Sequence, residues 1–363
     1  MGAFSWPPAA LSRKDDLAMK NRLFTALLSA VLLLGLAACG KSTPAASSSG
    51  AASSGTDASV STQAPSDPVN VMVLSGPTGV GAARMMTPPA TSVIAEPSPY
   101  NFTVAAGNDE VTPAIAKGEV DIACIATNLA ASLYNKDIGI RVLAVNTLGV
   151  LYILEKGNTV TDVASLKGKT VYTTGQGANP EYILDYLLTQ NGLDPDKDVD
   201  IQFMTPQEVT AKMLQSTDGI CMLPVPAATA LLIKDAGVRE VLNVSDEWDK
   251  VAPAPLVMGC VVARTDFMDE HPELVDKFMA DYKASIDYMN DPANLAAAAK
   301  LVAANGITAN EAIAQRAIPQ CNLTCTTGDE MRGAIQSYFD ILFTADPASI
   351  GGGNPDDDFY FVP

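Results

Sequence analysis

The stretch VNVMVLSGPTG, residues 69–79, shows how the folded part of this chain begins. Its first half, Val69–Ser75, is a short apolar run, and the turn-forming segment Gly76–Gly79 leads into helix-like residues. Apolar runs of this length, bounded by glycine and proline, are typical of buried strands. We therefore predict a strand, a loop and a helix, in that order, from Val69 onward.

The same order repeats further along the chain. The next strand candidates are Tyr100–Ala105, Val120–Ala126 and Arg141–Val145, and helix-like stretches separate them. Strands and helices that alternate in this way predict an α/β fold, with a mostly parallel sheet covered by helices.

A second unit of the same kind follows the first. Its strand candidates are Thr147–Leu154, Thr170–Thr174, Val199–Phe203 and Gly219–Leu223, and Leu256–Ala263 is a last buried strand before a mainly helical remainder. The chain thus leaves the first unit and later returns to it. This path predicts two lobes. The first is formed by residues 69–148 together with 256–363, and the second by residues 149–255. Ligands of open α/β sheets bind in crevices at the carboxyl ends of strands.

Composition narrows the functions open to this chain. Hydrophobic residues make up 48% of the 363 residues, which is enough for a sizeable core. A net charge of −18 argues against nucleic-acid binding, which needs basic side chains to neutralise phosphates. His271 is the single histidine, so triads and histidine-rich metal sites have no second member to draw on. We predict no catalytic residue, no metal and no cofactor.

The N-terminal 68 residues are predicted to be an export signal and a tether. Lys20 and Arg22 precede the apolar run Leu23–Leu36, and Ala37, Ala38 and Cys39 follow. Residues 1–38 are therefore predicted to be upstream residues, 1–18, followed by a secretory signal that starts at Met19. Cysteine directly after small residues resembles the lipobox of bacterial lipoproteins, whose cysteine carries lipid. A signal anchor with an incidental cysteine is the alternative. Residues 39–68 are rich in Ser and Ala and cannot bury enough surface to fold.

Five further cysteines remain in the chain. Cys124, Cys221 and Cys260 lie in apolar, strand-like runs and are predicted to be small buried hydrophobic residues. Cys321 and Cys325 are four positions apart, and an exported protein can oxidise such a pair. The sequence leaves open whether they form a disulfide.

Several stretches resemble solute-binding lipoproteins of bacterial ABC importers, in the nitrate/sulfonate/taurine-type (NMT1/THI5-like) group. They include Gly118–Ala123, Leu166–Val171, Gly175–Leu188 and Asn191–Leu193. No single stretch is specific to this group, but the order of the stretches behind the lipobox and tether is specific. The resemblance covers residues 69–363.

This resemblance implies a type II periplasmic-binding fold, with two lobes that are each a mixed sheet flanked by helices. It implies that the lobes close around a small solute and deliver it to a permease and ATPase complex. It further implies a site outside the cytoplasm and a lipid anchor to the membrane through Cys39.

Ligand contacts are predicted in four loops at strand ends. The predicted residues are Ser75, Thr78, Gly79, Thr127, Asn128, Gly175, Gln176, Gly177, Asn179 and Pro224. Amides at a helix start, hydroxyls and close glycine backbones suit a polar ligand. Asn128 has the alternative role of capping its helix. Glu181, at the start of the next helix, is placed either to meet a cationic ligand or to act as a favourable acid in the first turn. None of the four loops carries Lys, Arg or His, which favours a neutral, zwitterionic or cationic solute.

Two rival functions stay open at this point. An enzyme on the same two-lobed fold would need a nucleophile or an acid–base pair in the cleft, and Cys221 is the one thiol close to a predicted cleft loop. A receptor that passes ligand occupancy to a signalling partner would use the same closure.

Overall fold

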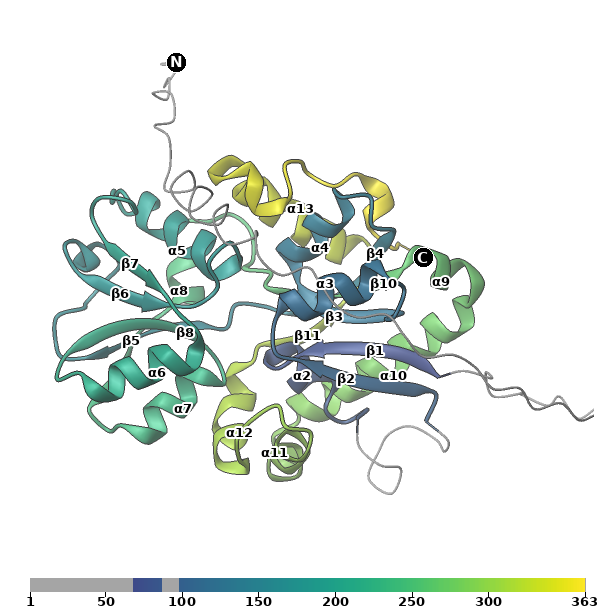
Figure 1. Cartoon of the computed structure of the whole chain (residues 1–363), viewed down its shortest axis with the longest axis horizontal. Coiled ribbons are helices and arrows are strands. Elements are labelled where there is room, and N and C mark those ends of the chain that lie inside the picture. The colour runs from purple at the N-terminus through teal and green to yellow at the C-terminus, as the bar shows by residue number, and fades with distance from the viewer. Residues whose placement is uncertain (1–67, 87–97, 363) are drawn as a thin grey trace, which may run out of the picture. The chain divides into compact units, whose positions relative to one another are not determined.

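In the computed structural model, which describes residues 68–86 and 98–362, the strands gather into two separate mixed sheets (Figure 1). All described residues belong to one compact unit. The predicted signal segment, Cys39 and the tether lie outside the described residues. Within the part of the chain that the structure describes, no helix is both long and apolar enough to span a membrane.

The first sheet has six strands in the order β11-β4-β10-β3-β1-β2. Their bounds are Val69–Leu74 (β1), Tyr100–Ala105 (β2), Ile122–Ala126 (β3), Ile140–Thr147 (β4), Gly259–Arg264 (β10) and Leu323–Thr326 (β11). β1 runs parallel to β2 and β3, as predicted, but β10 is antiparallel to both of its neighbours, β3 and β4. The sheet is therefore mixed, which confirms the fold implied by the family resemblance; the mostly parallel sheet predicted from the strand–helix alternation is wrong, because β10 runs in the opposite direction to both of its neighbours.

Helices cover both faces of the first sheet. One face packs on α3 (Asn108–Ala116), α4 (Thr127–Tyr134) and α13 (Gly328–Ala345), and the other on α2 (Pro77–Ala82) and α10 (Pro272–Asn290). α10 buries Val275, Phe278, Tyr282, Ile286 and Met289, at the three- and four-residue spacing of an amphipathic helix. The shorter helices α9 (Thr265–Glu270), α11 (Leu295–Ala304) and α12 (Glu311–Ala317) complete this lobe.

The second sheet has five strands in the order β7-β6-β8-β5-β9. Their bounds are Leu151–Lys156 (β5), Thr170–Thr173 (β6), Asp200–Phe203 (β7), Gly219–Pro224 (β8) and Val238–Asn243 (β9). β6 is parallel to β7 and β8, whereas β5 is antiparallel to β8 and β9. Helices α5 (Asn179–Gln190) and α8 (Val244–Asp249) pack on one face, and α6 (Pro206–Gln215) and α7 (Ala227–Lys234) on the other.

Two crossovers connect the sheets and are tied down by hydrogen bonds. On the first, the Leu148 N–H donates to the Asn322 carbonyl over 3.1 Å, and the Asn322 side chain donates to the Gly149 carbonyl. On the second, Nε1 of the fully buried Trp248 donates to the Ala254 carbonyl over 2.7 Å. Hydrogen bonds therefore hold the backbone of both connections between the lobes in place.

Several element boundaries differ from the sequence prediction. α2 begins at Pro77 and not after the glycine-rich turn, because proline fits the first turn of a helix. β4 continues to Thr147, which had been assigned to the next strand. β9 and β11 were not predicted. Cys321 and Cys325 are free thiols, and Sγ of Cys321 donates to the Ala317 carbonyl over 3.3 Å.

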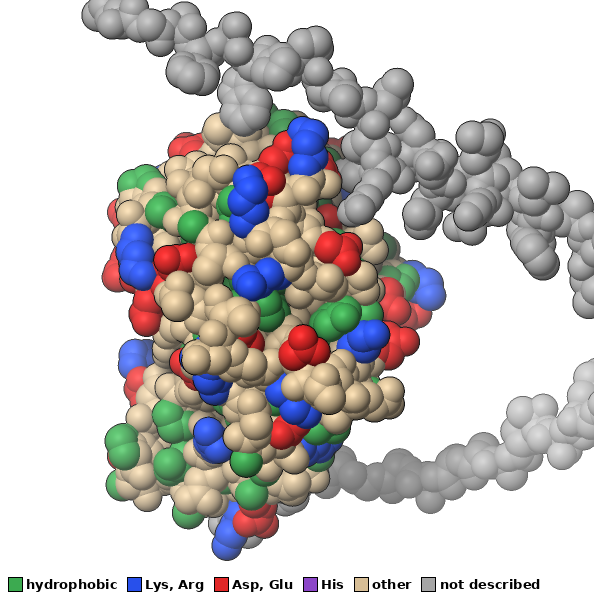
Figure 2. Space-filling view, turned by 90° about the vertical axis from the view of Figure 1, so that its left-hand side faces the viewer, with side chains coloured by type: hydrophobic (Ala, Val, Ile, Leu, Met, Phe, Trp, Pro, Cys, Tyr) green, Lys and Arg blue, Asp and Glu red, His purple; other side chains and the backbone are tan. Residues whose placement is uncertain are grey.

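Figure 2 shows the molecule from the side of the second sheet. Acidic and basic side chains are interspersed over this face, with small hydrophobic areas between them. Some of these charges are paired in this lobe, such as Lys156 with Asp235 at 2.7 Å. The negative net charge is thus not gathered into one acidic patch on the face in view.

Glu155 is a buried carboxylate at the end of β5, only 2% exposed. Its oxygens accept hydrogen bonds from the N–H and hydroxyl of Thr159, both at 2.7 Å, and from Nη2 of Arg239 at 2.6 Å. Burial opposes ionisation, but these hydrogen bonds outweigh it and hold the pKa of Glu155 below its usual value. The charged form therefore stabilises the second lobe.

We expect Glu155→Gln to lower the free energy of unfolding at pH 7 by about 1–3 kcal/mol, because the hydrogen bonds to a charged oxygen are lost. The difference in stability between the two proteins should shrink as the pH falls from roughly 4.3, the usual glutamate pKa, through the lower pKa of Glu155 in the folded protein. In that range the wild-type carboxyl becomes protonated and loses its charge, as the glutamine has none. Denaturant unfolding across this pH range measures it. Glu119→Gln, at an exposed site, is the control, and a difference that did not change with pH would contradict the assignment.

Candidate functional site

Four residues of the first lobe crowd around one point beside the crossovers. Gly259 pairs with Thr147 across β10 and β4. A Cβ atom added to Gly259 would lie 2.5 Å from Oδ1 of Asn146, and 3.0 Å from Cβ of Thr147 and from Cγ2 of Thr78. Contacts that short leave no room for a side chain at position 259. Thr78, a predicted ligand residue, thus lies next to Asn146 and Thr147, which were not predicted.

The start of α2 holds Thr78 in this place. The first backbone hydrogen bond of the helix runs from the Val80 N–H to the Gly76 carbonyl over 3.0 Å. α2 sits tightly on the end of β1, since a Cβ atom at Gly79 would lie 2.5 Å from the Leu74 carbonyl oxygen. The amides of Thr78 and Gly79 precede the first helical hydrogen bond, which is the usual position of unpaired N–H groups.

Asn146 and Thr147 are buried polar residues at the carboxyl end of β4, 0% and 2% exposed. Oγ1 of Thr147 has no hydrogen-bond partner among the described residues, and the Asn146 amide makes no hydrogen bond of full geometry with them. A buried polar group without a partner costs about 1–3 kcal/mol. The signal in the sequence was a polar pair that ends an apolar strand, directly before a crossover.

The polar cluster extends from Asn146 toward α10. Oη of Tyr282 is fully buried, with the Cys124 thiol and the Asn146 amide as its polar neighbours. Burial raises the pKa of the Cys124 thiol to about 12, and weak hydrogen bonds from the side chains of Tyr282 and Asn146 oppose this rise. Cys124, Asn146 and Tyr282 therefore lie together beneath α2.

Asn179 of the second lobe makes its side-chain hydrogen bonds to the first lobe. Its Nδ2 donates to the Met258 carbonyl at 3.1 Å and to Oγ1 of Thr127 at 3.4 Å. Its Oδ1 accepts from Oη of Tyr338 at 3.1 Å. Oγ1 of Thr127 in turn donates to the Val257 carbonyl at 2.6 Å. Thr127 and Asn179 are both predicted ligand residues, and the structure brings them together.

Further contacts join the lobes on two sides. The Trp248 ring lies 4.9 Å from the Tyr186 ring and 5.7 Å from the Tyr338 ring, measured between centroids. On the other side, Oγ1 of Thr229 in α7 donates to Oε1 of Gln320 over 3.2 Å. The arrangement is therefore one in which the lobes touch, with buried side chains shared between them.

Asn128 and Ser75 have other surroundings. The N-cap of α4 is Ala126, without a side-chain cap, so the alternative role of Asn128 as a helix cap is wrong. Nδ2 of Asn128 instead donates to the Ser349 carbonyl over 3.3 Å. Ser75 is exposed, and its N–H donates to the Ala105 carbonyl over 2.8 Å. Ligand contact by either residue stays a prediction.

The glycine loop before α5 folds on itself. Gly175 and Gly177 have φ angles of 76° and 73°, in the left-handed region that favours glycine. The Gly177 N–H donates to the carboxylate of Glu181, and Gln176 is exposed. Pro224 ends β8, opposite Leu151 of β5. Glu181 thus orders the loop, and the roles of Gly175, Gln176, Gly177 and Pro224 toward a ligand stay predictions.

Titratable groups do not form a reactive centre around the cluster. The guanidinium of Arg84 lies over the Tyr288 ring, 4.4 Å from its centroid. Burial raises the pKa of Cys221 to about 12, so its thiol is protonated at neutral pH. Within residues 68–86 and 98–362, no three His, Cys, Asp or Glu side chains are placed to hold a metal ion.

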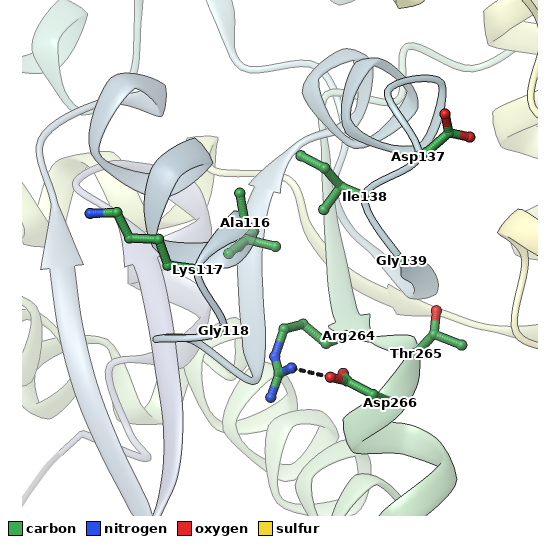
Figure 3. Close-up of a pocket in the computed structure, with 10 residues that line it drawn as sticks. Ala116, Lys117, Gly118, Asp137, Ile138, Gly139, Arg264, Thr265 and Asp266 are labelled. Atoms are coloured by element: carbon green, nitrogen blue, oxygen red, sulfur yellow. Dashed lines mark hydrogen bonds and ion pairs between the residues drawn. The ribbon is translucent and has the colours of Figure 1, made fainter.

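A pocket of ≈ 590 Å³ lies at the far end of the first sheet, where β3 and β4 begin and β10 ends (Figure 3). Arg264 points into it from β10. Its guanidinium is already engaged, because it donates to Asp121 and to the Val120 carbonyl, both at 3.0 Å, and pairs with Asp266. The Arg264 guanidinium of this pocket is therefore already satisfied by its neighbours.

Comparison with known proteins identifies a family and a fold. Residues 101–295 match the family model described as NMT1/THI5 like. No curated protein matches the chain closely enough to count as a relative.

Among solved structures, an ABC transporter protein from Parabacteroides distasonis aligns with a TM-score of 0.67 and 23% identity, over 82% of this chain and 98% of that one. The periplasmic aliphatic sulphonate binding protein SsuA from Escherichia coli aligns with a TM-score of 0.64 and 15% identity, over 82% and 92%. The ligand-binding component of an ABC-type import system from Staphylococcus aureus aligns with a TM-score of 0.64 and 15% identity, over 82% of this chain and 97% of that one. At these identities the likeness establishes the two-lobed fold.

We expect Asn179→Ala and Tyr338→Phe each to lower the free energy of unfolding by about 1–3 kcal/mol, because each leaves a buried partner unsatisfied. The double variant should lose less than the sum, by about 1 kcal/mol, since both changes remove the same hydrogen bond. Denaturant unfolding of the four proteins measures this coupling. Asn101→Ala, at an exposed position, is the control; additive losses would show that the two side chains do not interact.

Proposed function

The chain belongs to the NMT1/THI5-like family, and from this premise we propose that it is the solute-binding component of an ABC import system. Its fold supports the proposal, because two lobes joined by two crossovers can move as rigid bodies about those connections. We place the lobe boundaries at 148/149 and 255/256, as the sequence predicts.

Capture of the solute is proposed to work by closure of the lobes. The hydrogen bonds of Asn179 to Thr127, Met258 and Tyr338 belong to an arrangement in which the lobes touch, and opening would break them. A ligand that contacts both lobes binds this arrangement better than an open one and therefore shifts the population toward it. Closure needs no chemical step and no catalytic residue.

The observation that carries the proposal is the meeting of the lobes at two predicted ligand residues, Thr127 and Asn179. Thr147 lies beside them at the end of β4, because its carbonyl accepts from the Met258 N–H, and its buried hydroxyl has no partner among the described residues. A solute held at this junction is proposed to bond to that hydroxyl. The glycine loop and Pro224 are proposed to approach it from the second lobe.

The remaining features of the proposal concern where the protein works and with what. We propose that Cys39 carries lipid and that the Ser/Ala-rich tether, residues 39–68, holds the folded part outside the cytoplasm. A permease and its ATPase are the proposed partners, and nucleic acid is not. The solute is proposed to lack a strong negative charge.

Native mass spectrometry of the full chain, purified without refolding, tests solute binding. We expect a small retained mass that disappears on denaturation. Thr147→Val keeps the shape of the side chain but removes the hydroxyl, so the dissociation constant for the retained solute should rise roughly tenfold, and its occupancy should fall, if that hydrogen bond is worth about 1.4 kcal/mol.

Thr161→Val, at an exposed loop position, is the matched control and should keep the wild-type occupancy. If the wild type carries no small mass, a thermal-shift panel of vitamins, amines and sulfonates follows. Failure of every compound to stabilise the fold would reject the solute-binding function.

A further inference from the structure

Helix α5 of the second lobe lies against α13 of the first. At the start of α5, Oδ1 of Asn179 accepts from Oη of Tyr338 in α13 over 3.1 Å. Tyr182 and Asp185 follow on the same side of α5, because residues three apart on a helix are neighbours on its surface. Asp346 comes directly after α13, about two turns beyond Tyr338. The two helices therefore bring an acidic residue of each lobe to one place.

Asp185 is partly buried at this contact, and its carboxylate is not paired with any described residue. The hydrogen bond that Oγ1 of Thr189 donates to this residue, over 2.8 Å, goes to the backbone carbonyl. In the part of the chain that the structure describes, no hydrogen-bond donor and no cation meets the carboxylate itself. Burial of an unpaired charge is costly. The charged form of Asp185 therefore destabilises the contact between α5 and the first lobe.

Two neighbours of Asp185 are carboxylates that backbone amides hold in place. Glu181 lies one turn earlier on α5 and accepts from the Gly177 N–H. Asp346 accepts from the Ala348 N–H over 2.9 Å. Like charges one helical turn apart repel each other, and Asp346 adds a further negative charge from the other lobe. The repulsion at Asp185 thus has one part within α5 and one part that exists only while the lobes touch.

No basic group of the described residues offsets these charges. The charged groups that act on Asp185 come from α5, from the loop after it and from the first lobe: Glu181, Asp196 and Asp346. Tyr182 faces Asp185 as well, and its raised pKa keeps it neutral. Lys197, next to Asp196, is paired with Asp194 instead. Burial, and after it the three carboxylates, raises the pKa of Asp185 to about 7.

These contacts form an interface whose charge depends on pH. We propose that Asp185 makes closure of the lobes pH-dependent, because its carboxylate opposes contact with Asp346 and the protonated acid permits it. This inference rests on the lobe movement of the proposed function but not on any particular solute. Separation of the lobes removes Asp346 and admits water, so the pKa of Asp185 falls back toward the usual aspartate value of about 3.9. The touching arrangement therefore binds the proton more tightly and is favoured by acid.

Small-angle X-ray scattering of the full chain tests this movement, because closure reduces the radius of gyration. Any retained small mass is first removed by dialysis, and native mass spectrometry verifies that it is gone. We expect the radius to be smaller at about pH 5.5 than at about pH 8. The ratio of touching to separated lobes should rise by at most roughly thirtyfold over that range, since one proton with pKa values of about 7 and about 3.9 links the two arrangements.

Two substitutions and a control assign the effect to the acidic contact. Asp185→Asn removes the charge that titrates, so this variant should keep the smaller radius at both pH values. Asp346→Asn removes the charge of the first lobe but keeps an oxygen that can accept from the Ala348 N–H, so the pH-dependent change should shrink. Asp218→Asn makes the same change at an exposed position of the second lobe and should behave as the wild type. All other titratable groups, His271 included, are the same in the four proteins.

The outcomes separate this inference from the solute-binding function. A radius that does not change with pH in the wild type, or that changes equally in Asp185→Asn, would overturn the inference. The wild type and Asp346→Asn decide the matter even where Asp185→Asn fails to fold. A retained solute together with a radius that is independent of pH would overturn the inference and leave solute binding intact. Acid-favoured closure, with no retained mass and no stabilising compound, would support the inference and reject the solute-binding function.

Discussion

The contact between the two lobes depends on the hydrogen bonds of one buried side chain, Asn179. Asn179 belongs to the second lobe, yet the hydrogen bonds that the described residues give its amide run to Met258, Thr127 and Tyr338 of the first. It is 1% exposed, so water cannot replace those partners while the lobes touch. A buried amide that only the other lobe can pair makes the position of α5 conditional on contact between the lobes.

Asn146 is in the opposite situation, although the two residues carry the same amide. The polar side chains next to it are those of Cys124 and Tyr282, and its contacts with them fall short of full hydrogen-bond geometry. The same group is therefore well satisfied at Asn179 and poorly satisfied at Asn146, where it contributes less to stability.

Local patterns in the sequence were enough for the alternation of strands and helices, because apolar runs between glycine and proline are short-range signals. The mixed strand directions were implied by the family resemblance and not by those patterns. The local patterns were not enough for β9 and β11, short strands whose pairing with β5 and β4 comes from distant parts of the chain. The position of Asn146 beside Gly259 and Tyr282 could not be predicted for the same reason, since those residues are far away in sequence. Thr127 and Asn179 were each predicted to be cleft residues, from different lobes, but a contact between them was not foreseen.

The contacts between lobes bear on affinity as well as on shape. A solute that binds only the closed arrangement has an apparent dissociation constant equal to its intrinsic value divided by the closed fraction. Hydrogen bonds of Asn179, and the rings of Trp248 and Tyr338 at 5.7 Å, raise that fraction before any solute arrives. Affinity is thus shared between residues that touch the solute and residues that touch only the other lobe. Asn179 contacts the other lobe and stays a predicted ligand residue, so sequence reasoning that searches for ligand contacts alone leaves out its contribution to closure.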